Sequence, residues 1–164
     1  MNYRIATVDD LLQVIPIYKT AIERMAVNGI EQWDMEAYPT NEDILRDIEK
    51  REMYVGIQND RIVVAYTINK EADAQYQNAS WSEGFSFLIV HRLCVAPEFQ
   101  HQNIARETMT HIQDESRCYG IKAIHLDAFK QNPYAISLYK KLGYRKWGEA
   151  EWRNGKFNLY ELLL

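Results

Sequence analysis

Apolar positions along the chain follow two spacings, which predict a sheet combined with helices. Spacings of three and four residues predict helices that begin near Thr7, Thr40, Asn103 and Asn132. Apolar runs bounded by turn residues predict strands at residues 3–5, 53–58, 61–69, 87–95, 123–129, 144–152 and 157–163. The order β-α-α-β-β-β-α-β-α-β-β indicates an α/β fold, with a mixed, mostly antiparallel central sheet of about seven strands and about four flanking helices.

Turn residues separate these elements. Asn59-Asp60 and Asn154-Gly155 lie between pairs of predicted strands, so each pair is expected to form a hairpin. Residues 70–84 are polar and irregular, and we expect them to form the most mobile loop.

Size and composition narrow the class of protein. The 164 residues are enough for one domain, which we expect to span residues 1–164. The net charge of −4 gives no support to a general nucleic-acid-binding role. The N-terminal residues contain no long apolar run, so neither a signal peptide nor a membrane span is expected, and the cytoplasm is the expected location. The four histidines and two cysteines show no metal-ligand spacing, so no metal is expected.

The transition from the strand at 87–95 to the helix near Asn103 is the most informative stretch. A strand that turns into a helix N-terminus presents unpaired backbone N–H groups and the positive end of the helix dipole. Such a site suits an anion, and we expect it to hold a phosphorylated cofactor. The turn lacks glycine, but Asn103 belongs to a residue type that tolerates the left-handed backbone region.

Three local patterns resemble the GNAT acetyltransferase superfamily. They are L-C-V-A-P-E-F-Q-H-Q-N-I-A at 93–105, N-P-Y-A-I-S-L-Y-K-K-L-G-Y at 132–144 and G-I-E-Q-W-D at 29–34, the last resembling a bacterial subgroup. Together with the element order, the resemblance covers nearly the whole chain. It implies transfer of an acetyl group from acetyl-CoA to a primary amine of a small molecule or a protein, by direct attack of the amine.

The resemblance also implies a set of cofactor-binding residues. Backbone groups of Leu93 and Val95 would pair with the pantetheine arm, and N–H groups of residues 102–106 would hold the pyrophosphate. The full expected set is Leu93, Cys94, Val95, Gln100, His101, Gln102, Asn103, Ile104, Ala105, Arg106, Asn132 and Tyr139. Asn103 stands where the family usually has glycine, which leaves two readings open. Either asparagine takes over the left-handed turn, or the site is degraded and binds the cofactor weakly.

Tyr139 is the candidate general acid. It lies seven residues after Asn132, on the same helical face, and by resemblance its hydroxyl would protonate the departing thiolate. The alternative is a core tyrosine, the role that we expect for Tyr134 and Tyr144.

His91 is the candidate general base, because an ordinary histidine pKa suits proton removal. A hydrogen-bonded sheet histidine is an equally good interpretation. Weaker candidates for the base are Glu83, Glu98, His125 and Asp127. A chain of water molecules would serve without any single base.

The acceptor pocket is expected between the first two helices. There, Glu31, Trp33 and Asp34 combine an aromatic ring with carboxylates, which suits a cationic amine. The alternative is a packed interhelical loop. For Cys94 we favour a buried structural thiol over an acyl-carrying nucleophile.

Other functions remain open on the sequence. A longer acyl chain would suit the same fold, and a non-catalytic acyl-CoA-binding or regulatory module would suit a degraded turn. A protein that serves only in interactions would bind no acetyl-CoA. The apolar strand at 157–163 leaves a homodimer open, as an exposed edge or a paired strand.

Overall fold

The computed structural model describes residues 1–164 and contains seven strands and four α-helices. The strands are β1 (Asn2–Ile5), β2 (Met53–Gln58), β3 (Arg61–Asn69), β4 (Phe87–Val95), β5 (Ala123–Phe129), β6 (Arg145–Trp152) and β7 (Gly155–Leu163). The α-helices are α1 (Leu11–Val27), α2 (Asn41–Glu49), α3 (Ile104–Cys118) and α4 (Pro133–Lys141), and short 3-10 helices are η1 (Val8–Asp10), η2 (Ala74–Asn78) and η3 (Pro97–Phe99). The strands follow the order β1-β2-β3-β4-β5-β7-β6, so the predicted mixed α/β fold is confirmed.

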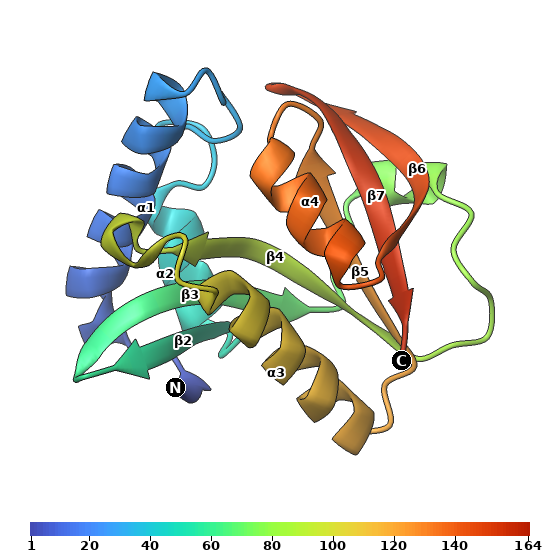
Figure 1. Cartoon of the computed structure of the whole chain (residues 1–164), viewed down its shortest axis with the longest axis horizontal. Helices are drawn as coiled ribbons and strands as arrows, with labels where there is room; N and C mark the ends of the chain where they lie inside the picture. Colours follow the sequence, from blue (N-terminus) through green and yellow to red (C-terminus); the bar gives the residue numbers. More distant parts are fainter. The chain divides into compact units, whose positions relative to one another are not determined.

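The chain forms two compact units that alternate along the sequence. Unit 1 comprises residues 1–68 and 92–108, and unit 2 comprises residues 69–91 and 109–164. Strand β4 and helix α3 therefore each contribute residues to both units. Figure 1 labels helices and strands of both units.

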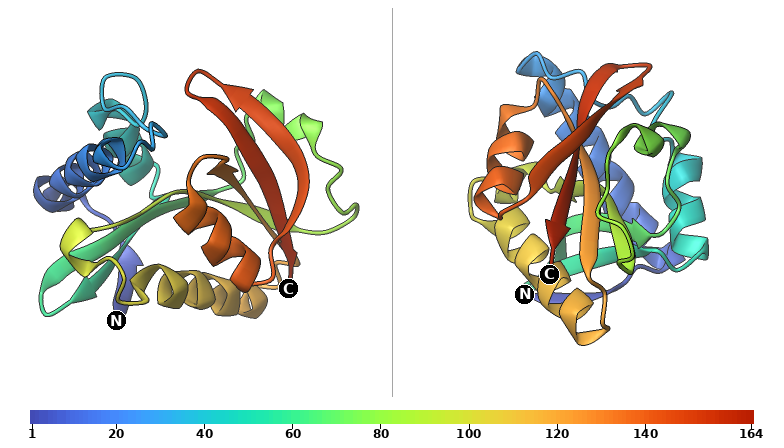
Figure 2. Two further views of the ribbon diagram at one scale, coloured as in Figure 1. Left: turned by 45° about the horizontal axis from the view of Figure 1, so that its top comes forward. Right: turned by 90° about the vertical axis from the view of Figure 1, so that its right-hand side faces the viewer.

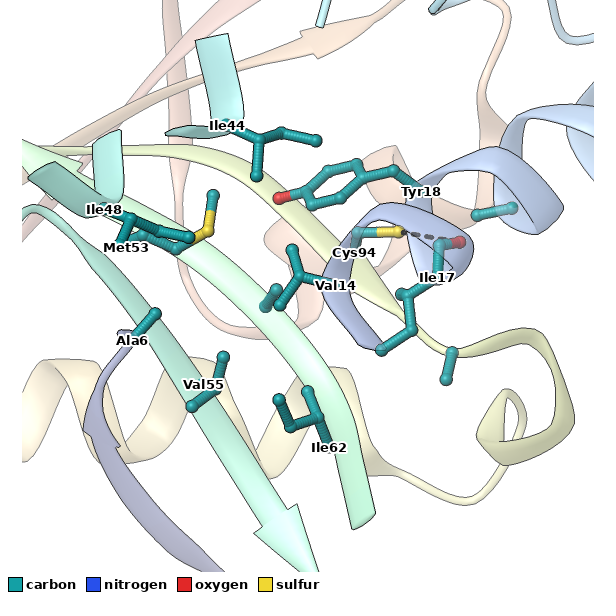
Figure 3. Close-up of a cluster of buried hydrophobic side chains, with 13 residues drawn as sticks. Ala6, Val14, Ile17, Tyr18, Ile44, Ile48, Met53, Val55, Ile62 and Cys94 are labelled. Atoms are coloured by element: carbon teal, nitrogen blue, oxygen red, sulfur yellow. Dashed lines mark hydrogen bonds between the residues drawn. The ribbon is translucent and has the colours of Figure 1, made fainter. Parts of the chain in front are cut away.

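Unit 1 is built on antiparallel pairing of β1 with β2 and of β2 with β3. Asn59 and Asp60 both have a positive φ, 50° and 59°, as the predicted tight hairpin turn requires. Apolar side chains from α1, α2 and the strands form one core cluster (Figure 3). Its members are Ala6, Val14, Ile17, Tyr18, Ala21, Ile44, Ile48, Met53, Val55, Ile62, Ala65, Cys94 and Ala96.

Unit 2 combines parallel and antiparallel pairing. The first half of β4 pairs in parallel with β5, and β7 pairs antiparallel with both β5 and β6. Strand β7 is therefore paired along both sides. Of the two alternatives for residues 157–163, an exposed edge or a paired strand, the structure shows the paired strand. Helix α4 and η2 lie on opposite sides of the β5–β7 strands (Figure 2).

The predicted mobile loop packs against other residues of unit 2. We call residues 70–86 the covering segment, since they lie between β3 and β4 and contain η2. The Trp81 ring stacks on His125 with 4.0 Å between ring centroids, and the Ser80 N–H donates to the Trp147 carbonyl at 3.3 Å. A Cβ added at Gly148 would lie 2.7 Å from the Ala79 Cα, so η2 approaches β6 backbone to backbone. These partners are more than 40 residues away in sequence, so no local pattern announces the packing.

Candidate functional site

The predicted site residues fall into two groups, one in each unit. Unit 1 holds the second half of β4, the turn into α3 and the loop between α1 and α2. Unit 2 holds His91, Asn132 and Tyr139. Each group is built from its own contacts.

The second half of β4 carries Leu93, Cys94 and Val95. Leu93 and Val95 are half-buried, whereas Cys94 is buried against α1, with its Sγ 4.0 Å from the Ile17 carbonyl oxygen (Figure 3). Burial raises the pKa of the Cys94 thiol to about 12. The thiol stays protonated at neutral pH, as expected of a structural cysteine.

The turn between β4 and α3 is folded by two glutamine side chains. The Gln100 amide donates to the Val95 carbonyl at 3.3 Å, and the Gln102 amide donates to the Glu98 carbonyl at 3.1 Å. These bonds are local, and they fold residues 96–103 into a compact turn, which we call the cofactor loop. The polar side chains therefore support the backbone of the loop.

Asn103 adopts the left-handed conformation, which is the turn of the first of the two readings that the sequence left open. Its φ is 64°, and His101 two residues earlier has φ 62°. The Asn103 carbonyl accepts the first helical hydrogen bond of α3, from the Glu107 N–H at 2.9 Å. The N–H groups of residues 104–106 precede that bond and have no intrahelical partner. Alternating backbone conformations followed by a helix N-terminus form an anion-binding concavity.

The loop between α1 and α2 is built around Trp33 and Asp34. The half-buried Trp33 ring lies 5.7 Å from the Tyr18 ring and packs on the core of unit 1. Asp34 forms a turn, since its side chain accepts from the Glu36 N–H at 2.9 Å and its own N–H donates to the Tyr38 carbonyl at 2.8 Å. Glu31 is exposed. Among the three predicted acceptor residues, Trp33 packs on the core and Asp34 stabilises a turn, whereas Glu31 is exposed to solvent.

The sequence analysis missed a charged residue in β4 whose side chain is largely buried. Arg92 has φ 54° and forms an ion pair with Asp47 of α2, whose carboxylate also accepts from the Thr67 hydroxyl at 2.7 Å. The available signal was a charge inside each of two apolar patterns, at Arg92 in a strand and at Asp47 on a helix face.

In unit 2, Asn132 begins α4 as its pattern predicted, and Tyr139 lies in the last turn of this helix. The Asn132 side chain caps the helix by accepting from the Ala135 N–H at 3.2 Å. Tyr139 is buried and packs against Tyr144 and Tyr160, with centroid distances of 5.7 and 6.3 Å. Burial, with a smaller contribution from the charge of Asp127, raises the pKa of Tyr139, so its phenol is protonated at neutral pH.

His91 forms a hydrogen bond within unit 2. Its Nε2 lies 2.9 Å from the side-chain oxygen of Asn69. In the tautomer whose Nε2–H donates to this amide oxygen, Nδ1 carries the lone pair of the neutral ring. The contact agrees with a hydrogen-bonded sheet histidine and is compatible with a base that uses Nδ1.

The four weaker candidates for the general base lie in different environments. The Asp127 carboxylate accepts from the Tyr76 hydroxyl at 2.8 Å. His125 is buried and lies 3.0 Å from the Glu161 carboxylate. Glu98 forms an exposed ion pair with Arg61, and Glu83 is exposed.

The two tyrosines that we expected in the core differ. Tyr144 is buried, with 3% of its surface exposed, whereas Tyr134 is 62% exposed. The expectation for Tyr134 was wrong because it follows the N1 proline at the start of α4, where its side chain points away from the packed face.

Neither metal ligands nor membrane spans stand out in the structure. The side chains form no group of three or more His, Cys, Asp or Glu that could hold a metal ion. None of the helices combines the length and the apolar character that crossing a membrane demands.

Comparison with known proteins identifies the family. The model of the acetyltransferase (GNAT) family matches residues 14–144. A search of curated proteins finds no match. Three solved structures share the fold. A GNAT family acetyltransferase from Streptococcus agalactiae is 21% identical with a TM-score of 0.86, covering 99% of this chain and 95% of that one.

The second is a ribosomal-protein-alanine N-acetyltransferase from Brucella melitensis, 17% identical with a TM-score of 0.74, covering 100% of both chains. The third is yncA, a putative acetyltransferase from Salmonella typhimurium with its cofactor acetyl-CoA. It is 18% identical with a TM-score of 0.72, covering 100% of this chain and 94% of that one. Since the family model spans most of the residues, the chain belongs to the acetyltransferase (GNAT) family.

Proposed function

We propose that the chain transfers an acetyl group from acetyl-CoA to a primary amine of a small molecule or a protein. Family membership supports the reaction type. The observation that carries the proposal is the backbone of the cofactor loop, where His101 and Asn103 are both left-handed immediately before α3. Asn103 stands where the family usually has glycine, and its left-handed conformation is one that glycine readily adopts in such a turn.

The cofactor loop and β4 would bind acetyl-CoA through main-chain groups. N–H groups of residues 102–106 would hold the pyrophosphate, and the backbone of Leu93 and Val95 would pair with the pantetheine amides. Acetyl-CoA supplies a thioester whose carbonyl carbon is open to attack. The neighbour that was crystallised with acetyl-CoA supports this choice of co-substrate.

Two side chains would move the protons. His91 would accept the proton of the attacking amine at Nδ1, and the Tyr139 hydroxyl would protonate the thiolate as the carbon–sulfur bond breaks. The raised pKa of Tyr139 supports this role, because the phenol carries its proton at neutral pH. Glu31, Trp33 and Asp34 would contact the acceptor, where an exposed carboxylate favours a cation.

The test of the activity is release of coenzyme A. The protein is incubated with acetyl-CoA together with one amine at a time, and the released thiol is titrated. The amines are polyamines, amino acids and peptides with free N-termini. We expect release that depends on the amine and an acetylated product by mass spectrometry. Acetyl-CoA binding without release for any amine would favour the alternative, a non-catalytic acyl-CoA-binding or regulatory module. No binding would contradict both. A parallel series with propionyl- and butyryl-CoA tests a longer acyl chain.

Tyr139→Phe tests the acid. We expect kcat to fall by about 100-fold with the KM for acetyl-CoA within about threefold, because general acid catalysis contributes roughly that factor. Tyr144→Phe is the matched control, since it removes a hydroxyl from the buried ring that packs edge-on against Tyr139. Equal kcat values for the two variants would reject the assignment of Tyr139 and leave acetyl transfer intact.

A further inference from the structure

Arg92 combines two energetic costs at one position of β4. Its φ of 54° lies in the left-handed region, which costs a residue other than glycine about 1–2 kcal/mol. Its side chain is 11% exposed, so a charge is removed from most of its water. Conformations of this kind persist only where the surroundings enforce them, and they concentrate at functional sites.

The backbone of Arg92 is held by α1. The Tyr18 hydroxyl donates to the Arg92 carbonyl oxygen at 2.6 Å. Tyr18 has no exposed surface and is part of the core cluster, from which its side chain extends toward β4 (Figure 3). Burial raises the pKa of Tyr18 well above its ordinary value, so the hydroxyl remains a donor.

The side chain of Arg92 is held by α2 and by the loop between α1 and α2. Its Nη1 pairs with the Asp47 carboxylate of α2, and Asp47 accepts from Thr67 of β3. The Tyr38 ring covers the guanidinium, 4.8 Å from its central carbon. Burial opposes the charge of Arg92, but Tyr38 and Asp47 outweigh it, and the pKa of Arg92 is raised.

We propose that Tyr18 and Arg92 are positioning residues, which fix the left-handed backbone of β4 so that Leu93 and Val95 present their main-chain groups to acetyl-CoA. This inference rests on the proposed function. An apolar residue at this position would avoid the cost of burying a charge, but it would have no guanidinium to pair with Asp47 while Tyr18 holds the carbonyl. The position directly precedes the segment that would pair with pantetheine.

Tyr18→Phe tests the backbone anchor, because it keeps the ring and removes the donor. We expect the Kd for acetyl-CoA and its KM to rise about five- to tenfold, as loss of one buried hydrogen bond implies, with kcat within about twofold. Tyr3→Phe is the control, since it removes a hydroxyl that donates to Thr108 at 3.2 Å elsewhere in unit 1. It should lower the melting temperature by a similar amount and leave the Kd unchanged.

Arg92→Gly and Arg92→Ala test the conformation itself. Both lose the ion pair with Asp47, but only glycine adopts φ 54° without strain. We expect the glycine variant to bind acetyl-CoA at least about threefold more tightly than the alanine variant. Parent-like affinity of Tyr18→Phe, or equal affinities of the two Arg92 variants, would overturn the positioning role alone. A parent protein that binds no acetyl-CoA would overturn the proposed function as well.

Discussion

The covering segment and the cofactor loop are both polar and irregular in sequence, yet they are fixed by opposite means. The covering segment depends on distant side chains. Tyr76 donates to Asp127, Trp81 stacks on His125, and Ser82 donates to Glu161 at 2.6 Å. The cofactor loop depends on glutamine bonds that span four or five residues and on left-handed backbone. Distant contacts hold the covering segment against β5 and β7. Local contacts in the cofactor loop leave the N–H groups of residues 104–106 without an intrahelical partner.

We expect the largest effect from a substitution that disrupts the packing of the covering segment on β6. In Gly148→Ala, the new Cβ would lie 2.7 Å from both the Ala79 Cα and the Asn78 carbonyl oxygen, and backbone cannot yield as a flexible side chain would. We expect the free energy of unfolding to fall by about 2–3 kcal/mol, measured by urea denaturation. The near-ultraviolet circular dichroism of Trp81 and its aromatic neighbours should change as well.

Gly84→Ala is the matched control inside the covering segment. Gly84 has φ 77° and open space around the added Cβ, so its variant carries only the conformational cost of about 1 kcal/mol. A Gly148→Ala protein no less stable than this control would mean that η2 does not depend on its close approach to β6.

An intermediate effect is expected in the cofactor loop. A β-branched residue is strongly disfavoured at φ 64°, so Asn103→Val should weaken acetyl-CoA binding by about tenfold, or about 1.4 kcal/mol. Asn103→Gly should bind at least as tightly as the parent, because glycine adopts the same turn freely. Calorimetric titration measures both. Weaker binding by the glycine variant would show that the Asn103 side chain itself contacts the cofactor.

The smallest effect concerns pH and the covering segment. Burial lowers the pKa of His125 below 6.5, although the Glu161 hydrogen bond opposes this shift. Between the lowered value and 6.5 the unfolded chain binds more protons than the folded one, so the free energy of unfolding decreases as pH falls through this window.

His125→Gln keeps a donor for Glu161 and removes the titration. The stability difference between parent and variant should therefore shrink as the pH is lowered below 6.5, in paired urea denaturations. A stability difference that stays constant with pH would show that titration of His125 does not contribute to the stability of the folded protein.

The sequence reveals what is fixed locally. The hairpin at Asn59-Asp60, the cap at Asn132 and the left-handed turn at Asn103 each follow from the residue type at the position. The bounds of β2, β3, β4 and β5 agree with the predicted ranges, because apolar runs end at polar turns.

Other features depend on partners that no local pattern names. Nothing in the run around Arg92 announces a positive φ, since its anchors Tyr18 and Asp47 are 74 and 45 residues away in sequence. The packing of the covering segment cannot be inferred from its own sequence for the same reason, since Tyr76 and Trp81 contact Asp127 and His125 of β5.

Tyr18 and Arg92 each contact the loop between α1 and α2 as well as each other. The Trp33 ring packs against Tyr18, and the Tyr38 ring covers Arg92. An amine that displaced Trp33 or Tyr38 would therefore disturb the anchors of β4. Thermodynamic linkage then requires reciprocity: the factor by which such an amine changes the affinity for acetyl-CoA equals the factor by which acetyl-CoA changes the affinity for the amine. Through these two aromatic contacts, the affinities of unit 1 for an amine and for acetyl-CoA would be coupled.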